Sequence, residues 1–186
     1  REPNQWDYLR SRLLTVWRRE AEVGSRPRRI RVWSSACSSG EEPYTLGMAL
    51  LAGLPPDWSV EVLATDISTK VLDRAVAAVY PMERLHEIPA DLHKRFRRRG
   101  TGPRAGAFRV GPSVRNVVRF QRENLVTGDF TPLGNFDLIL CRNVLMYFQP
   151  STRRKVVARL LEQLAPGGQL FVGHSESLHG LELDVQ

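Results

Sequence analysis

The sequence has few of the residues that mark several large classes of protein. Its two cysteines, Cys37 and Cys141, are too few for a disulfide framework or a zinc site. Its four histidines show no metal-ligand spacing, so we expect no metal. The longest apolar run, at positions 46–54, has nine residues, less than half of a membrane span. A signal peptide is also lacking, and we expect a cytoplasmic domain without membrane insertion.

Lysine is scarce as well, because 24 of the 27 basic residues are arginine. The net charge of +7 comes from one segment: residues 81–122 hold eleven basic and three acidic side chains, whereas the other 144 residues sum to −1. A basic patch favours an anionic partner, and a solvated arginine-rich face is the alternative. Few aromatic residues lie between the arginines, which argues against base stacking. We therefore expect a protein partner and no nucleic acid.

The hydrophobic pattern predicts helices and strands in alternation within one domain of 186 residues. The expected helices cover 5–23, 41–53, 68–78, 89–99 and 151–164, and the expected strands cover 30–33, 59–65, 116–121, 136–141 and 169–173. A small hairpin is expected over 108–114, with its turn at 111–113. Such alternation is typical of a parallel sheet covered on both faces. Residues 80–115 interrupt it and have the character of an insertion.

The loop after the first expected strand is rich in small residues and ends in an acidic pair. Residues 34–43 read Ser-Ser-Ala-Cys-Ser-Ser-Gly-Glu-Glu-Pro. In an open α/β sheet, ligands bind outside the carboxyl ends of the strands, and this loop lies at such an end. Glu41 and Glu42 repel phosphate and favour a cation such as an ammonium or sulfonium group. In the alternative interpretation, the two glutamates only complement the dipole of the next helix.

Two further strand ends carry residues suited to a nucleoside. Asp66, after the second strand, can bind both hydroxyls of a ribose, or it is the N-cap of the next helix. Asn124, after the third strand, can read the amino edge of an adenine, or it is a turn residue. Together with the loop at 34–43, these residues favour S-adenosylmethionine over a dinucleotide.

The fourth strand ends in polar residues at a place that is usually buried. Arg142 can pair with a carboxylate, and the hydroxyl of Tyr147 can orient one. Alternatively, Arg142 is a satisfied structural residue and Tyr147 belongs to the core.

Four motifs resemble, in order, those of the CheR-type chemotaxis receptor glutamate O-methyltransferases. They cover 32–44, 63–72, 136–148 and 166–177, and the similarity runs from residue 1 to around residue 178. The resemblance implies an α/β fold, a doubly wound and mostly parallel Rossmann-like sheet with a small antiparallel β-subdomain inserted. It also implies S-adenosylmethionine as cofactor and S-adenosylhomocysteine as product.

The resemblance assigns roles to individual residues. Glu42 is expected to bind the amino group of the methionine moiety and Asp66 the ribose, while Asn124 and Leu125 flank the adenine. The complete set implied to bind the cofactor is Ala36, Glu42, Asp66, Ile67, Asn124, Leu125, Cys141, Arg142 and Asn143. The implied catalytic set is Arg1 beside the reacting methyl group, Arg142 in the pocket floor and Tyr147 facing the incoming glutamate.

The resemblance also divides the chain. Residues 1–28 are expected to be a helix and linker that follow a helical domain outside the sequence. Residues 29–186 are expected to be the S-adenosylmethionine-binding domain, stopping short of the family's closing strands, with 80–115 as the inserted basic β-subdomain. The segment 81–122 is a candidate for binding the tether at the C-terminus of a chemoreceptor.

The implied activity is methyl transfer to glutamate carboxylates on the cytoplasmic helices of chemoreceptors, forming glutamyl methyl esters in chemotaxis adaptation. One alternative is a degenerate module that binds the cofactor or the receptor without catalysis. The presence of Glu42, Asp66, Asn124, Arg142 and Tyr147 argues against it. Another is a nucleic-acid methyltransferase, but the chain has no Asn-Pro-Pro-Tyr base pocket.

Overall fold

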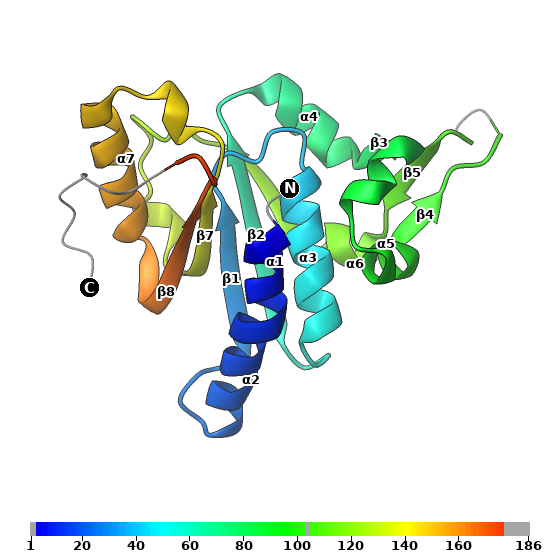
Figure 1. Cartoon of the computed structure of the whole chain (residues 1–186), viewed down its shortest axis with the longest axis horizontal. Helices are drawn as coiled ribbons and strands as arrows, with labels where there is room; N and C mark the ends of the chain where they lie inside the picture. Colours follow the sequence, from blue (N-terminus) through cyan, green and yellow to red (C-terminus); the bar gives the residue numbers. More distant parts are fainter. Residues whose placement is uncertain (1–2, 103–104, 177–186) are drawn as a thin grey trace.

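The computed structural model describes residues 3–102 and 105–176 of the chain. Its centre is a five-stranded sheet in the order β6-β2-β1-β7-β8, with every neighbouring pair parallel (Figure 1). The strands are β1 (Arg29–Ser34), β2 (Ser59–Asp66), β6 (Val118–Arg122), β7 (Phe136–Cys141) and β8 (Leu164–Val172). Strands are added on both sides of β1, with β2 and β6 on one side and β7 and β8 on the other, so the sheet is doubly wound. The expected fold class is confirmed.

Alternate residues of the central strands build two hydrophobic clusters, one on each face of the sheet. Val32 and Val62 belong to the cluster that holds the buried residues of α3 (Glu41–Gly53). Trp33 and Leu63 belong to the cluster that holds the buried residues of α7 (Pro150–Leu161). Because both faces are covered, inner strand segments such as residues 62–64 and 138–141 are apolar at consecutive positions rather than alternating ones.

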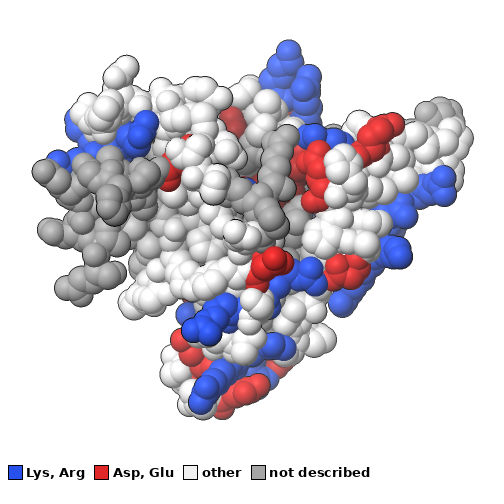
Figure 2. Space-filling view, viewed as in Figure 1, with Lys and Arg blue, Asp and Glu red and all other residues white. Residues whose placement is uncertain are grey.

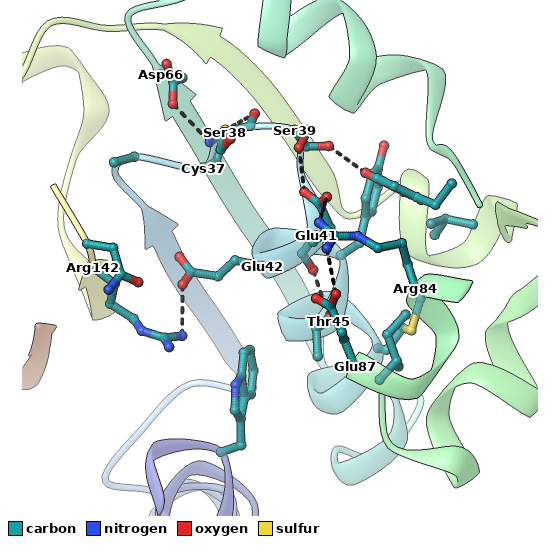
Figure 3. Close-up of a pocket in the computed structure, with 18 of the residues that line it drawn as sticks. Cys37, Ser38, Ser39, Glu41, Glu42, Thr45, Asp66, Arg84, Glu87 and Arg142 are labelled. Atoms are coloured by element: carbon teal, nitrogen blue, oxygen red, sulfur yellow. Dashed lines mark hydrogen bonds and ion pairs between the residues drawn. The ribbon is translucent and has the colours of Figure 1, made fainter. Parts of the chain in front are cut away.

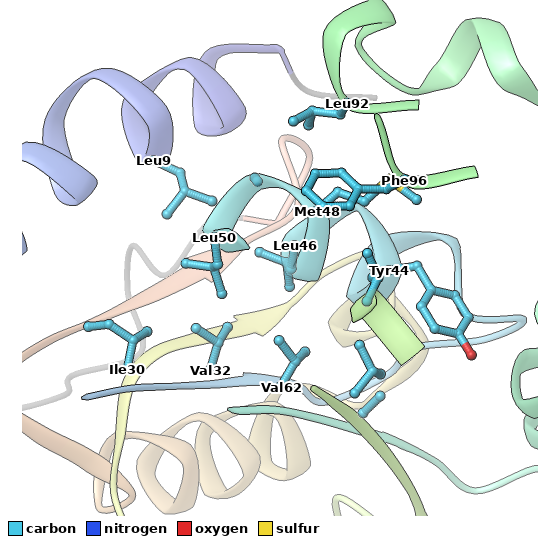
Figure 4. Packing of buried hydrophobic residues seen from close by; sticks show 14 of the residues in the cluster. Leu9, Ile30, Val32, Tyr44, Leu46, Met48, Leu50, Val62, Leu92 and Phe96 are labelled. Atoms are coloured by element: carbon cyan, nitrogen blue, oxygen red, sulfur yellow. The ribbon is translucent and has the colours of Figure 1, made fainter. Parts of the chain in front are cut away.

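Helix α3 is packed on nearly all sides. Residues 43–50 of this helix are all buried. Figure 4 shows Leu46 and Leu50 pointing toward the sheet, while Met48 lies toward Leu92 and Phe96 of α5 (Ala90–Phe96). A helix without a polar face must be covered all round, and here the sheet and α5 enclose it.

The expected N-terminal helix is present but irregular. It consists of α1 (Pro3–Tyr8), a π-helical segment at Leu9–Leu13 and α2 (Leu14–Glu22). Its buried side chains Leu9 and Trp17 join the cluster around α3. Helix α4 (Thr69–Ala77) follows β2 close to its expected position. None of the helices in the described ranges is both long and apolar enough to cross a membrane.

A second, antiparallel sheet lies beside the first, with the strand order β3-β5-β4. Its strands are β3 (Val79–Pro81), β4 (Arg97–Arg99) and β5 (Ala107–Val110), and η2 (Met82–Glu87) and α5 connect β3 to β4. This sheet occupies the right side of Figure 1, apart from the five-stranded sheet. The expected small antiparallel sheet is therefore present.

Two local predictions in this part of the chain are wrong. The helix expected over 89–99 ends at Phe96, because Arg97–Arg99 pairs with β5 across the sheet. The hairpin expected over 108–114 does not form, since β5 takes β3 and β4 as partners. Pro112 instead opens the short helix α6 (Pro112–Arg115), where its fixed φ suits a first helical turn.

The last strand is also longer than expected. Helix α7 ends at Leu161, and β8 begins at Leu164 rather than at residue 169. The segment Pro166-Gly167-Gly168 thus lies within the strand, where the pairing with β7 shifts register between Phe136 and Leu138. A bulge of this kind lets a strand accommodate proline and glycine.

Candidate functional site

A cavity of about 400 Å³ opens at the carboxyl ends of β1, β2 and β7, within the size range of cofactor sites. Its walls come from the loop after β1, the start of α3, Asp66, the turn after β7 and the inserted segment (Figure 3). In the strand order, β1 lies between β2 and β7. The chain first adds β2 and β6 on one side of β1 and then β7 and β8 on the other side, so the direction of the strand order reverses at β1. Ligands of doubly wound sheets bind at this kind of switch point.

The loop after β1 is held by hydrogen bonds of its backbone from two directions. Cys37 N donates to Thr65 O at 2.8 Å, which ties the loop to β2. The hydroxyl of Tyr80, from β3, donates to Ser39 O at 2.7 Å. Burial, followed by the charge of Glu41, raises the pKa of that hydroxyl, so it stays protonated and remains a donor. The inserted segment therefore helps to shape the loop.

Gly40 ends this loop in a conformation that other residues adopt rarely. Its φ is +93°, and a Cβ here would lie 2.8 Å from Ala75 Cβ and 2.9 Å from the Tyr80 hydroxyl oxygen. Gly24 shares the positive φ of +76° but has nothing within 4 Å of a Cβ. The two glycines thus separate backbone strain from steric crowding.

Gly40→Ala is expected to destabilise the fold more than Gly24→Ala. The φ strain costs both variants about 1 kcal/mol, and crowding against α4 costs Gly40→Ala about 2 kcal/mol more. Urea denaturation of both variants and the parent chain measures the difference. Equal losses of unfolding free energy would show that α4 does not press on the loop.

The Asp66 carboxylate links the loop after β1 to the end of β2. Its Oδ2 accepts a hydrogen bond from Ser38 N at 2.9 Å, and its Oδ1 accepts one from Ser68 N at 3.0 Å. The second contact is a turn closed by the side chain of Asp66. Asp66 is not the N-cap considered from the sequence, because α4 begins at Thr69 and its N-cap is Ser68. Asp66 also lines the cavity, so its structural and ligand-binding roles are compatible.

Glu42 and Arg142 form an ion pair across the cavity, between the start of α3 and the end of β7 (Figure 3). Arg142 Nη1 lies 3.0 Å from Glu42 Oε2, and Ser34 Oγ donates to Glu42 Oε1 at 2.7 Å. The side chains are 5% and 20% exposed, respectively. Separating two such poorly exposed charges would leave each of them unpaired, which is costly, so the ion pair keeps both side chains in place.

A second charged network closes the side of the cavity formed by the inserted segment. Arg84 bonds Glu41 at 2.9 Å and Glu87 at 2.6 Å. Burial alone would raise the pKa of Glu41, but hydrogen bonds from Arg84, the backbone and Ser39 together hold it below its usual value. Glu41 therefore stays ionised and bound to Arg84.

Five of the residues predicted to bind cofactor line this cavity: Ala36, Glu42, Asp66, Arg142 and Asn143. Cys141 is fully buried in the cluster around α7, and Leu125 belongs to the same cluster. Ile67 is exposed. The Asn124 side-chain oxygen accepts from Val126 N and Thr127 N, so it is engaged within its own turn.

Of the three predicted catalytic residues, the structure places one in the cavity wall and one on the surface. Arg142 lies in the cavity wall. Tyr147 does not belong to the core: it is 79% exposed, in the short helix η5 (Leu145–Tyr147) that follows β7. Arg1 lies outside the described residues.

Sequence reasoning missed several cavity residues. Trp6, Tyr80, Arg84 and Glu87 line the cavity but come from the N-terminal helix and the insertion. The helical spacing of Trp6 marked a buried face, and nothing in it marked a ligand site. In the sequence, Arg84 stands out only as part of the basic segment.

A doubly wound sheet with a nucleoside-sized cavity at the ends of β1 and β2 defines the class of Rossmann-like cofactor-binding domains. The chain matches the family described as "CheR methyltransferase, SAM binding domain" over residues 1–186, and it belongs to this family. The expected family and its cofactor, S-adenosylmethionine (SAM), are thereby confirmed. Among the described residues, no group of three or more His, Cys, Asp or Glu could hold a metal ion.

Curated relatives are similar over most of this chain. It is 46% identical over 153 residues to "Chemotaxis protein methyltransferase 2" of Pseudomonas aeruginosa, covering 82% of this chain and 55% of the relative. It is 42% identical over 155 residues to "Chemotaxis protein methyltransferase" of Escherichia coli, covering 82% and 54%. The chain thus spans about half the length of these relatives, 55% and 54%. A solved structure, "The structure of PKMT2 from Rickettsia typhi in complex with AdoHcy", aligns with 78% of this chain and 21% of its own, at 16% identity and a TM-score of 0.48.

Proposed function

We propose that the protein transfers a methyl group from S-adenosylmethionine to glutamate side chains on the cytoplasmic helices of chemoreceptors. The observation that carries the proposal is the pair of carboxylates at the cavity, Asp66 at the end of β2 and Glu42 paired with Arg142. A cofactor with both a ribose and a cationic amino-acid end needs two such acceptors. Because the acceptor belongs to the cytoplasmic part of a receptor, the proposed compartment is the cytoplasm.

The cavity residues fit this cofactor by their chemistry. Asp66 would accept hydrogen bonds from the two ribose hydroxyls, and Glu42 would bind the ammonium group. The backbone of Ala36 and Cys37 would lie along the ligand, since small side chains allow close approach. Ile67 and Leu125 would flank the adenine, with Asn124 contributing its amide NH2 group because its oxygen is engaged. Arg142, Asn143 and Cys141 would form the floor.

The proposed reaction requires little acid–base catalysis from the protein. When bound, S-adenosylmethionine would supply a methyl carbon for attack by the carboxylate oxygen, and its sulfur would leave as a neutral thioether. A glutamate carboxylate is already ionised at pH 7, so the chain needs no general base. Its residues would instead align the acceptor oxygen with the methyl group and exclude water. Tyr147 would orient the acceptor, and its exposure in the short helix that follows the cavity-lining Asn143 supports this role.

The inserted segment offers a surface for the receptor. Lysine and arginine line the right-hand edge of the molecule in Figure 2, where Figure 1 places β4 and α5. Arg98 and Arg99 are exposed, and β4 forms one edge of its three-stranded sheet. This edge suits an acidic peptide. We include binding of the receptor's C-terminal tether by the 81–122 segment in the proposed function.

The test is methyl incorporation from labelled S-adenosylmethionine into a receptor helical fragment, with a fragment whose glutamates are replaced by alanine as control. Label that depends on the glutamates supports the proposal. Tight binding of S-adenosylhomocysteine without labelling of the receptor fragment would favour a binding module without catalysis. Receptor fragments with and without the C-terminal tether test the role of the basic segment.

Tyr147→Phe is expected to lower turnover about tenfold, the effect of one lost hydrogen bond to a charged group. Its affinity for S-adenosylhomocysteine should stay within twofold of the parent, because Tyr147 does not line the cavity. Tyr8→Phe removes a hydroxyl from another exposed tyrosine and serves as control. Kinetics and calorimetry give the two values. A large loss of affinity in Tyr147→Phe would assign this residue to the cofactor instead.

A further inference from the structure

We propose that Glu176 is a positioning residue that holds the turn after β7 in the shape the cofactor site requires. The inference rests on the proposed function, which assigns this turn to the cofactor and the acceptor. Glu176 lies just beyond β8, outside the residues that line the cavity. It is 5% exposed and among the few buried charged residues of the described chain.

The Glu176 carboxylate accepts four backbone hydrogen bonds. Its Oε1 accepts from Leu145 N at 2.7 Å and from Met146 N at 3.3 Å. Its Oε2 accepts from Asn143 N at 2.8 Å and from Gly173 N at 2.7 Å. Three of the four donors belong to the turn after β7, and the fourth to the end of β8. A single side chain therefore joins two strand ends.

The turn needs such an acceptor because its backbone is bent sharply. Asn143 has a φ of +57°, which is rare for a residue other than glycine. Successive N–H groups in a bend of this kind point into one hollow and create a local positive potential. Buried without an acceptor, each N–H would carry a desolvation cost. Glu176 supplies both the acceptors and the negative charge.

Gly173 provides the space that the carboxylate occupies. A Cβ at this position would lie 2.5 Å from Glu176 Oε2 and 3.0 Å from Asn143 N. Pairing of Cys141 with Val172 brings the ends of β7 and β8 side by side (Figure 1). Sheet register and a missing side chain thus place Glu176 against the turn.

The turn carries residues that the proposed reaction uses. Asn143 and Val144 line the cavity, next to Arg142 and its ion pair with Glu42. Helix η5, which bears Tyr147, begins at Leu145, one of the four donors. Loosening the turn would therefore move the cavity floor and the acceptor-facing tyrosine together, although Glu176 touches neither substrate.

Glu176→Gln tests this role with almost no change of shape. The new amide group places an N–H donor against backbone N–H donors, so part of the network must break. We expect binding of S-adenosylhomocysteine to weaken about tenfold, equivalent to ~1.4 kcal/mol. Hydrogen exchange should accelerate at the amides of Asn143, Leu145 and Met146. Calorimetry and amide-resolved exchange on the whole chain give both readouts.

Asp137→Asn is the matched control. Asp137 also accepts a backbone hydrogen bond, from Arg31 N at 2.8 Å, and pairs with Arg26, but it lies at the opposite end of β7. It should lower the melting temperature yet leave the affinity for S-adenosylhomocysteine unchanged. An affinity loss in both variants that only follows their melting temperatures would overturn the positioning role.

The failure of this inference is distinguishable from failure of the proposed function. If the parent chain binds S-adenosylhomocysteine and Glu176→Gln binds it equally well, the inference is overturned and the proposed function stands. If the parent chain does not bind, the proposed function loses its support, and exchange decides the inference. Faster exchange in Glu176→Gln than in the parent, confined to the three turn amides, then supports the positioning role of Glu176. Unchanged exchange overturns it.

Discussion

Replacing Asp66 with alanine should weaken binding of S-adenosylhomocysteine about 100-fold, since two hydrogen bonds to a charged group are worth roughly 1.5 kcal/mol each. Titration calorimetry measures this directly. The carboxylate lines the cavity at the end of β2, and each of its two oxygens already accepts one hydrogen bond, from Ser38 N and Ser68 N. Ribose hydroxyls would use the remaining acceptor positions of the same oxygens.

Two companion variants separate ligand binding from loop support. Asp66→Asn retains one oxygen that can accept from Ser38 N, but it lacks the charge, so its affinity should lie between those of the parent and Asp66→Ala. Asp73→Ala removes an exposed carboxylate from α4 and should bind normally. If Asp66→Ala bound S-adenosylhomocysteine with an affinity within threefold of the parent, at an unchanged melting temperature, Asp66 would not be a ligand-binding residue.

Both thiols of the folded chain are expected to react with iodoacetamide at pH 8 at least about a hundredfold more slowly than a free cysteine. Burial raises the pKa of Cys37 to about 12, with Asp66 and Glu42 adding to the effect. Burial likewise raises the pKa of Cys141 to about 12. The thiolate is the reactive form, so little of it is present at pH 8. The greater intrinsic nucleophilicity of a weakly acidic thiol offsets only part of that deficit.

Mass spectrometry of timed, quenched reactions gives the modification rate at each cysteine. The same chain in concentrated urea is the control, and there both thiols should be modified at the rate of a free cysteine. Cys37 lines the cavity, whereas Cys141 is 0% exposed beneath it. Rapid modification of Cys37 in the folded chain would show that the loop after β1 opens far more readily than its hydrogen bonds indicate.

The central sheet could be predicted because its signals are contiguous in the sequence. Runs such as residues 138–141 are apolar throughout, as strands buried on both faces are expected to be. The loop after β1 could be assigned for the same reason, since its small residues and acidic pair stand together. Local pattern failed at Arg97–Arg99: three arginines carry no strand signal, and their partner β5 begins eight residues later, beyond a Gly- and Pro-containing connection.

The parts of the site that the sequence did not reveal depend on contacts between distant segments. Arg84 reaches the cavity because the inserted segment packs against the start of α3 and pairs with Glu41. Trp6 arrives there on a helix whose spacing indicated only a buried face. Glu176 acts on a turn about 30 residues earlier through backbone groups, which any residues could supply. The motif at 166–177 contains Glu176, but its residues do not indicate which backbone groups the carboxylate contacts.

The place of β1 at the middle of the sheet has a consequence for synthesis on the ribosome. Its far neighbour is β7, and Ser35 and Leu140, which share a hydrogen bond, are 105 residues apart in sequence. At usual translation rates, residues 32–34 therefore wait about 5–20 s for that partner after they are made. During this interval a buried apolar strand presents an open edge, the kind of surface that pairs with other chains. Aggregation during expression should therefore depend on how soon β7 is completed.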